Sequence, residues 1–129
     1  MTTRLAIGDV SRRCGVAQTT LRYYEQIGLI PAPERVGGQR RYPESVLVRL
    51  EVIRLCKAAG FTLDEIAVLI GDETPGRPVA RSLAHAKLAR IDEQLEALTQ
   101  ARAIIEWGMR CTCPSIDTCT CGIHRAMPI

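Results

Sequence analysis

The sequence has few aromatic side chains and no long apolar run. Aromatic residues make up 4% of its 129 residues, which argues against a large aromatic-lined pocket for an organic ligand. No stretch approaches the roughly 18 apolar residues that a membrane-spanning helix needs. The first residues also lack the apolar run of a secretory signal peptide. We therefore expect a cytoplasmic protein that has no membrane partner.

Familiar catalytic arrangements are missing as well. We find no serine–histidine pair, no paired carboxylates and no phosphate-binding loop. A thiol-exchange site usually has Cys-x-x-Cys at a helix N-terminus, where the helix dipole lowers the thiol pKa. Here the clustered cysteines follow the C-terminus of an expected helix, where the dipole opposes thiolate formation. We therefore expect that the protein is not an enzyme.

The charge is unevenly distributed along a chain that is otherwise typical of a folded protein. Apolar residues make up 47%, enough to build a core. Residues 1–57 contain ten Lys or Arg and five Asp or Glu, whereas residues 58–129 contain seven and nine. A basic first part is typical of a nucleic-acid-binding region joined to a part with another role.

Glycine, proline and apolar spacing predict a mainly α fold. Four helices and a hairpin are expected in the first part, the helices over residues 7–14, 18–26, 44–58 and 62–70 and the hairpin within 31–43. Thr62 and Glu65 form the sequence pattern of a capping box at the start of the fourth helix. Two short helices around a glycine turn, followed by a basic hairpin, predict a winged helix-turn-helix.

A long helix is expected over residues 79–106, which contain neither glycine nor proline. Its apolar side chains recur by three and four with one charged interruption, as in a coiled-coil heptad: Leu88, Ile91, Leu95, Leu98, Arg102, Ile105 and Met109. This stripe predicts pairing with a second copy, hence a homodimer. The alternative is that it packs back on residues 1–70.

We expect three segments: a DNA-binding domain (1–75), a linker with a dimerisation helix (76–108) and a Cys-rich effector-sensing tail (109–129). Several side chains of the second helix and the hairpin suit base edges and phosphates: Gln18, Thr19, Arg22, Tyr23, Arg35, Arg40 and Arg41. The alternative is that the arginines are merely solvated and the tyrosines belong to the core. Because Tyr23 and Tyr24 point about 100° apart on a helix, we expect one of them in the core.

Six short motifs follow one another in a fixed order: Ile7-Gly-Asp-Val, Gly15-Val, Leu21-Arg-Tyr-Tyr-Glu25, Gly28-Leu-Ile, Gln39-Arg-Arg-Tyr42 and Gly60-Phe-Thr-Leu-Asp-Glu-Ile66. In this order they resemble the signature of the MerR family of transcription regulators, and the resemblance covers residues 5–108. It assigns the DNA groove to Gln18, Thr19, Arg22 and Tyr23, and the wing to Arg40, Arg41 and Tyr42.

The resemblance also implies how such a protein works. Two copies pair through an antiparallel coiled coil and bind a near-palindromic promoter. Family members twist and kink an overlong promoter spacer so that RNA polymerase can use it, which sets the deformation energy of DNA against phosphate contacts. An effector bound far from the DNA then shifts the dimer between two shapes.

Four cysteines of the tail form two Cys-x-Cys pairs: Cys111, Cys113, Cys119 and Cys121. Thiolates are soft donors, and a bound cation stabilises thiolates that otherwise repel one another. The pattern predicts a site for a soft transition-metal ion of the zinc, copper or mercury class. His124 is near enough in sequence to ligate as well. Cys14 and Cys56 are expected in the core instead.

Three interpretations of the tail stay open. The Cys111-x₇-Cys119 spacing resembles that of copper-sensing relatives, although residues 76–82 lack the cysteine that many metal sensors carry there. The run from Cys111 to Cys119 also resembles the last ligands of SoxR-like redox sensors, which carry a [2Fe–2S] cluster, but the first ligand of that motif would fall near Gly108. In the third interpretation the tail is structural, with or without zinc, and the effector is organic or absent.

Overall fold

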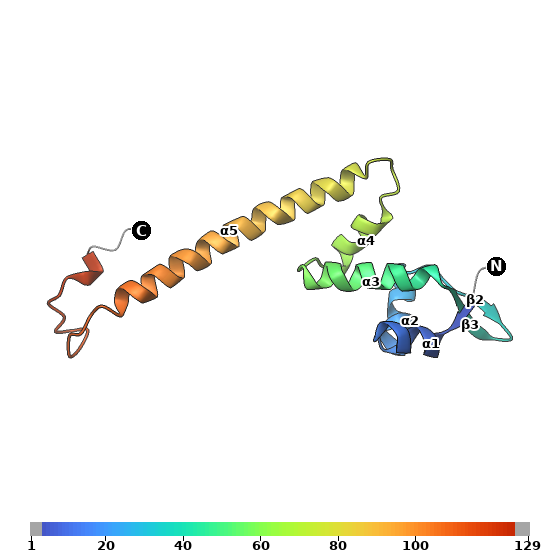
Figure 1. The fold of residues 1–129 in the computed structure, drawn as a ribbon, viewed down its shortest axis with the longest axis horizontal. Coiled ribbons are helices and arrows are strands. Elements are labelled where there is room, and N and C mark those ends of the chain that lie inside the picture. Colours follow the sequence, from blue (N-terminus) through green and yellow to red (C-terminus); the bar gives the residue numbers. More distant parts are fainter. Residues whose placement is uncertain (1–3, 126–129) are drawn as a thin grey trace. The chain divides into compact units, whose positions relative to one another are not determined.

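The computed structural model describes residues 4–125, which belong to two compact units, Met1–Leu83 and Ala84–Ile129. Figure 1 shows helices separated by short connections, with one small sheet. In chain order the elements are β1 (Arg4–Ala6), α1 (Ile7–Cys14), α2 (Gln18–Gln26), β2 (Glu34–Val36), β3 (Gln39–Pro43), α3 (Ser45–Ala58), α4 (Leu63–Gly71), α5 (Pro78–Gly108) and the 3₁₀ turn η1 (Ile123–Arg125). The mainly α fold with a winged helix-turn-helix is confirmed.

The wing is a three-stranded antiparallel sheet in the order β1-β3-β2. Its hairpin turns at Gly37 and Gly38, whose φ angles are 58° and 80°. A two-residue turn with both φ angles positive matches the twist of the strands that it joins, and glycine adopts it without a steric penalty. The hairpin was expected, whereas β1 was not: it has three residues and is identifiable only by its pairing with β3.

The core of the first unit gathers side chains from every helix up to α4 and from two strands: Leu5, Val10, Leu21, Tyr24, Leu29, Ile30, Tyr42, Val46, Leu50, Ile53 and Ile66. As expected, one of the adjacent tyrosines belongs to it. Tyr24 is 4% exposed, whereas Tyr23 is 49% exposed. Burying one face of α2 in this way leaves the opposite face of the same helix for solvent or a ligand.

Two polar side chains define where α4 and α5 begin. The Thr62 hydroxyl accepts a bond from the Glu65 N–H at 3.2 Å, and the Glu65 carboxylate accepts one from the Thr62 N–H at 2.9 Å. This is the expected capping box. At α5, the Asp72 carboxylate accepts bonds from the N–H groups of Val79 and Ala80, at 2.9 and 3.1 Å. The Ala80 N–H is the main reason that the pKa of Asp72 is lowered.

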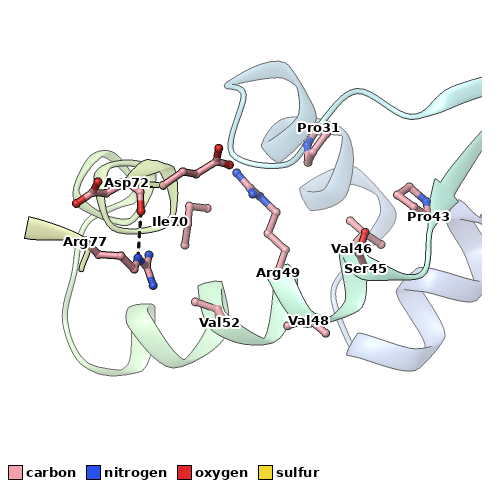
Figure 2. Close-up of a pocket in the computed structure, with 11 residues that line it drawn as sticks. Pro31, Pro43, Ser45, Val46, Val48, Arg49, Val52, Ile70, Asp72 and Arg77 are labelled. Carbon is pink, nitrogen blue, oxygen red and sulfur yellow. Dashed lines mark hydrogen bonds between the residues drawn. The ribbon is translucent and has the colours of Figure 1, made fainter. Parts of the chain in front are cut away.

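The turn before α5 is held by Arg77, which has a φ of 48°. Its Nε donates to the backbone oxygen of Asp72 at 3.1 Å (Figure 2), and its Nη2 donates to the backbone oxygen of Leu69. A non-glycine residue in the left-handed region is unfavourable by itself. These two hydrogen bonds offset that cost and connect the end of α4 to the first turn of α5.

The apolar stripe of α5 is largely exposed. Leu88, Leu95, Leu98, Ile105 and Met109 have exposed fractions between 57% and 77%. Within α5, the buried residue is Ala80, near the beginning of the helix. No helix among residues 4–125 is long and apolar enough to cross a membrane.

We expect Thr62→Ala to lower the free energy of unfolding by about 1 kcal/mol, because the N-cap bond of α4 is lost. Urea titration followed by circular dichroism at fixed protein concentration measures the change. Thr99→Ala is the control, since the Thr99 hydroxyl bonds only the Leu95 carbonyl of its own helix. Equal stabilities of the two variants would contradict the capping role.

Candidate nucleic-acid interface and metal centre

The exposed face of α2 carries the residues that the sequence predicted for DNA. Gln18, Thr19, Arg22 and Tyr23 are all exposed. They share this face because Leu21 and Tyr24 anchor the opposite one in the core. The face therefore offers amide, hydroxyl and guanidinium groups, which are the donors and acceptors that read base edges and bind phosphates.

Glu25 connects this helix to the wing. Its Oε2 accepts a bond from Arg40 Nε at 3.0 Å and one from the Tyr42 hydroxyl at 3.3 Å. The Arg40 and Glu25 side chains are only 24% and 19% exposed, so this ion pair is screened less than a surface pair. Sequence reasoning assigned no role to Glu25, because its partners lie 15 and 17 residues further along the chain.

Tyr42 was expected on the wing surface, but its side chain is fully buried. Successive side chains of a strand point to opposite faces, and the β3 position opposite Leu5 points into the core. Burial is the main cause that raises the Tyr42 pKa, and the Glu25 carboxylate adds to it. The hydroxyl therefore remains a donor to Glu25, and its side chain offers no surface to a phosphate.

The other wing arginines lie close together. Arg35 and Arg40 are directly opposed across β2 and β3, an arrangement in which like charges repel. Arg35 Nη1 donates to the Gly38 carbonyl at 3.2 Å, and Arg41 Nη2 donates to Gln39 Oε1 at 3.3 Å. Neither contact neutralises a positive charge. The hairpin thus keeps positive charge that an anionic surface would stabilise.

The four tail cysteines predicted as ligands come together in space. Cys111 lies just after α5, and a loop returns the chain so that the sulfur atoms of Cys111, Cys113, Cys119 and Cys121 all lie within 4.8 Å of one another. Cys119 Sγ is 3.6 Å from Cys111 Sγ and 3.3 Å from Cys121 Sγ. The loop is closed by the Ser115 and Thr118 hydroxyls, which are 2.6 Å apart.

This donor set fits one tetrahedral metal ion. With zinc–sulfur bonds of about 2.3 Å, tetrahedral ligands stand about 3.8 Å apart, close to the separations found here. A [2Fe–2S] cluster divides four cysteines between two irons bridged by sulfide, so the two pairs must stand further apart. All six cysteines are free thiols. The separations therefore suit a single ion better than a two-iron cluster.

The thiols of the cluster have opposite pKa shifts. The backbone N–H groups of Thr120 and Cys121 donate toward Cys113 and are the main causes that lower its pKa to about 6. The pKa of Cys119 is raised to about 12, first because of its hydrogen bond with the Cys121 side chain. The loop thus provides backbone donors that oppose the unfavourable helix C-terminus, which sequence reasoning did not anticipate.

Trp107, the only tryptophan of the sequence, connects η1 to α5. Its indole Nε1 donates to the Ile123 carbonyl at 2.6 Å, and the Arg110 guanidinium lies 4.7 Å from the centre of its ring. Sequence reasoning assigned no role to Trp107. Its bond closes a loop that contains all four clustered thiols.

The remaining candidates lie elsewhere. Cys14 and Cys56 are partly buried against the core, as expected, and burial raises the pKa of Cys56. Cys14 Sγ also contacts the Val10 carbonyl at 2.9 Å. The four-thiol group does not include His124, which lies in η1.

A hollow of about 660 Å³ lies on the first unit, beside α3 and the turn that precedes α5. Figure 2 shows Val48, Val52 and Ile70 around it, together with Arg49. The Arg49 Nε bonds the Leu29 carbonyl at 2.8 Å, and the Asp72 carboxylate caps α5. Arg49 and Asp72 are thus engaged in holding the fold, and the lining of the hollow includes none of the predicted site residues.

Comparison with known families gives two matches that together cover most of the chain. The family described as "MerR HTH family regulatory protein" matches residues 5–72. The family described as "MerR, DNA binding" matches residues 47–107. The first match spans the winged helix-turn-helix unit as far as Asp72, and the second extends nearly to the end of α5.

The chain is also similar to individual transcription regulators over nearly its whole length. The chain is 35% identical over 128 residues to the mercuric resistance operon regulatory protein of Bacillus cereus, covering 89% of this chain and 96% of that protein. It is 30% identical over 119 residues to the transcriptional activator SoxR homolog of Chromobacterium violaceum, covering 89% and 80%. The solved structure of the regulator PbrR691 from Ralstonia metallidurans CH34 with lead(II) has a TM-score of 0.65 at 30% identity and covers 96% and 99%.

We expect Cys113 to be alkylated fastest and Cys119 slowest among the clustered thiols of metal-free protein at pH 7. A pKa of about 6, against the ordinary 9.0, raises the thiolate fraction from about 1% to about 90%, and the lower intrinsic nucleophilicity leaves a gain of about fourfold. Mass spectrometry after brief iodoacetamide treatment measures the order. The advantage should disappear as the pH rises toward 9, where ordinary thiols also ionise; uniform labelling at pH 7 would contradict the shifts.

Proposed function

Because the chain belongs to the MerR family of DNA-binding transcription regulators, we propose that it binds a near-palindromic promoter as a homodimer and responds to a soft metal ion. The observation that carries the proposal is the convergence of four thiols within 4.8 Å beyond the helix that follows the DNA-binding unit. We assign DNA binding to residues 1–75, dimerisation to residues 76–108 and effector sensing to residues 109–129. Like other DNA-bound regulators, it would act in the cytoplasm.

The exposed stripe of α5 supports the homodimer. Four large apolar side chains of the stripe on α5, and Met109 just after the helix, have exposed fractions above 50%, and they recur with the coiled-coil spacing. A second copy of α5, running antiparallel, covers the stripe with its own. Arg102 interrupts the stripe, and its Nε donates to Glu106 Oε1 at 2.8 Å. The proposed pair of helices therefore has one charged position in an otherwise apolar seam.

The proposed DNA surface combines the exposed face of α2 with the wing: Gln18, Thr19, Arg22, Tyr23, Arg35, Arg40 and Arg41. Gln18 and Thr19 suit base edges, and the arginines suit phosphates. The hydrogen bond that Arg40 donates to Glu25 holds the wing at a fixed place relative to α2. Tyr42 contributes through Glu25 rather than by touching DNA.

Cys111, Cys113, Cys119 and Cys121 would hold the metal ion. Soft thiolates favour ions of the zinc, copper or mercury class, and one relative is named for mercuric resistance. A bound cation replaces the protons shared by the cluster and neutralises thiolates that otherwise repel one another. The loop of residues 111–121 then has one arrangement with the ion and another without it.

We propose that this difference reaches the promoter through the dimer. The ion shifts the equilibrium between two dimer shapes, and the two α2 helices and wings impose the favoured shape on the DNA between them. Twisting the duplex costs deformation energy that depends on its sequence, and phosphate contacts offset this cost. RNA polymerase, the partner typical of the family, would then engage the realigned promoter, and the protein acts as an activator.

The similarity to a SoxR homolog favours a second candidate, a redox-responsive regulator with a [2Fe–2S] cluster on the same cysteines. Anaerobic purification with a visible spectrum and a metal assay distinguishes the two. A colourless protein that binds one zinc, copper or mercury ion per chain supports the metal sensor, whereas a brown protein with equal iron and sulfide supports the cluster. A tail that binds zinc without any change in DNA binding or transcription would be structural.

We expect Arg41→Ala to weaken binding to every DNA sequence and to reduce the slope of log affinity against log salt by about 0.9 per protomer, since one phosphate contact is lost. Fluorescence anisotropy with promoter and random duplexes at several salt concentrations measures both. Arg90→Ala removes the same charge from the exposed surface of α5 and should leave the slope unchanged. Equal effects of the two substitutions would remove Arg41 from the DNA surface.

Replacing Cys111, Cys113, Cys119 and Cys121 together by Ser should abolish the metal response and leave promoter affinity unchanged, because the wing and α2 do not involve these thiols. In vitro transcription with and without metal measures the response, and a gel-shift assay measures the affinity. The matched control is Cys14→Ser with Cys56→Ser, which should respond normally. Induction that survives all four tail substitutions would place the sensor elsewhere.

A further inference from the structure

An apolar hollow lies beside the thiol cluster and has no role in holding a bare metal ion. It has a volume of about 520 Å³ and is lined mainly by apolar side chains of the second unit, with two of the cysteines in its wall: Ile104, Trp107, Gly108, Cys111, Ile116, Cys119, Ile123 and His124. It is thus large enough for an aromatic ring, and it presents thiols to whatever enters.

Three lining residues of the hollow lie in α5: Ile104, Trp107 and Gly108. Ile104 and Gly108 precede the stripe residues Ile105 and Met109 by one position each. Adjacent residues point about 100° apart around a helix, so the hollow lies beside the dimerisation seam and not on it.

The two cysteines in the wall are close enough to share one atom. Cys111 Sγ and Cys119 Sγ are 3.6 Å apart. A trivalent arsenic atom forms stable bonds to two thiolates, and its third bond can carry an organic group. An inorganic cation uses the four thiols and leaves the hollow empty, whereas an aryl arsenical uses two thiols and places its ring in the hollow.

We propose that this site binds a trivalent monoaryl arsenical, with arsenic on Cys111 and Cys119 and the aryl ring against Trp107 and Ile104. The inference rests on the proposed sensing role of the same thiols. In the reaction, an aryl-As(OH)₂ forms two As–S bonds and loses two As–O bonds. Each thiol proton leaves with one hydroxyl as water, so arsenic stays trivalent and no oxidant is needed. Burial of the ring then adds affinity that arsenite cannot obtain.

The test compares phenylarsine oxide with arsenite on the full-length metal-free protein. Trp107 fluorescence reports binding, since this is the only tryptophan, and thiol titration counts the cysteines consumed. We expect phenylarsine oxide to bind at least tenfold more tightly than arsenite and to consume two thiols. Peptide mapping should identify them as Cys111 and Cys119. Equal affinities, or consumption of another pair, would overturn the proposal.

A leucine at position 108 should fill the hollow without removing a thiol. Nothing lies within 4 Å of a Cβ built at Gly108, so the added side chain meets open space. Gly108→Leu should reduce the preference for phenylarsine oxide to less than threefold and keep the affinity for arsenite and zinc. The matched control is Ala97→Leu, on the same side of α5 but outside the lining, which should keep the full preference.

Ile104→Asn provides a second variant with unchanged thiols, and it should also lose the preference because the wall becomes polar. Circular dichroism confirms that each variant is folded. If both hollow variants keep the preference, the proposal is wrong. If the wild-type chain binds phenylarsine oxide with the expected preference but binds no soft metal ion, the metal-sensing function fails and the arsenical site stands.

Discussion

The structure depends on an apolar stripe that one chain leaves exposed. The first unit collects the core residues from β1 to α4, whereas the stripe exposes Leu88, Leu95, Leu98 and Ile105 of α5, and Met109 just after the helix. The 31-residue helix is about 46 Å long, and a narrow apolar stripe along it is stable in water when a matching stripe covers it. The exposed stripe therefore favours the proposed pairing of two copies of the chain.

The two ends of α5 are held by different contacts. At the start of α5, Asp72 and Arg77 use backbone groups to bind the helix to α4. At its end, Trp107 bonds the Ile123 carbonyl and closes the loop that holds the thiols. Both contacts use a side chain to bind backbone across a short loop. A change at either contact therefore changes how that end of α5 is attached to its neighbouring segment.

Sequence patterns predicted the elements whose signals are local. Glycine turns, the Thr62 capping box and the apolar spacing of α5 each lie within a few neighbouring residues, and the helices were placed correctly from them. What could not be predicted depends on residues far apart in the chain. β1 exists through its pairing with β3, Tyr42 points inward because Leu5 opposes it, and Glu25 matters because the wing returns to it. The four thiols were recognised by spacing, but the hollow beside them required the fold of the tail.

Protons and a metal ion would compete for the same four sulfur atoms of the thiol cluster. The backbone donors near Cys113 stabilise one thiolate, and the neighbouring thiols keep the proton of Cys119. Binding an ion to all four sulfurs must release the remaining protons, so the affinity for metal rises with pH. Among these thiols, Cys119 opposes metal binding most, because its pKa is raised to about 12 and its proton is therefore the hardest to remove. Soft ions overcome this cost because their bonds to sulfur are strong, whereas hard ions such as magnesium prefer oxygen ligands. In the proposed metal sensor, the protonation of the cluster would therefore favour soft ions over hard ones.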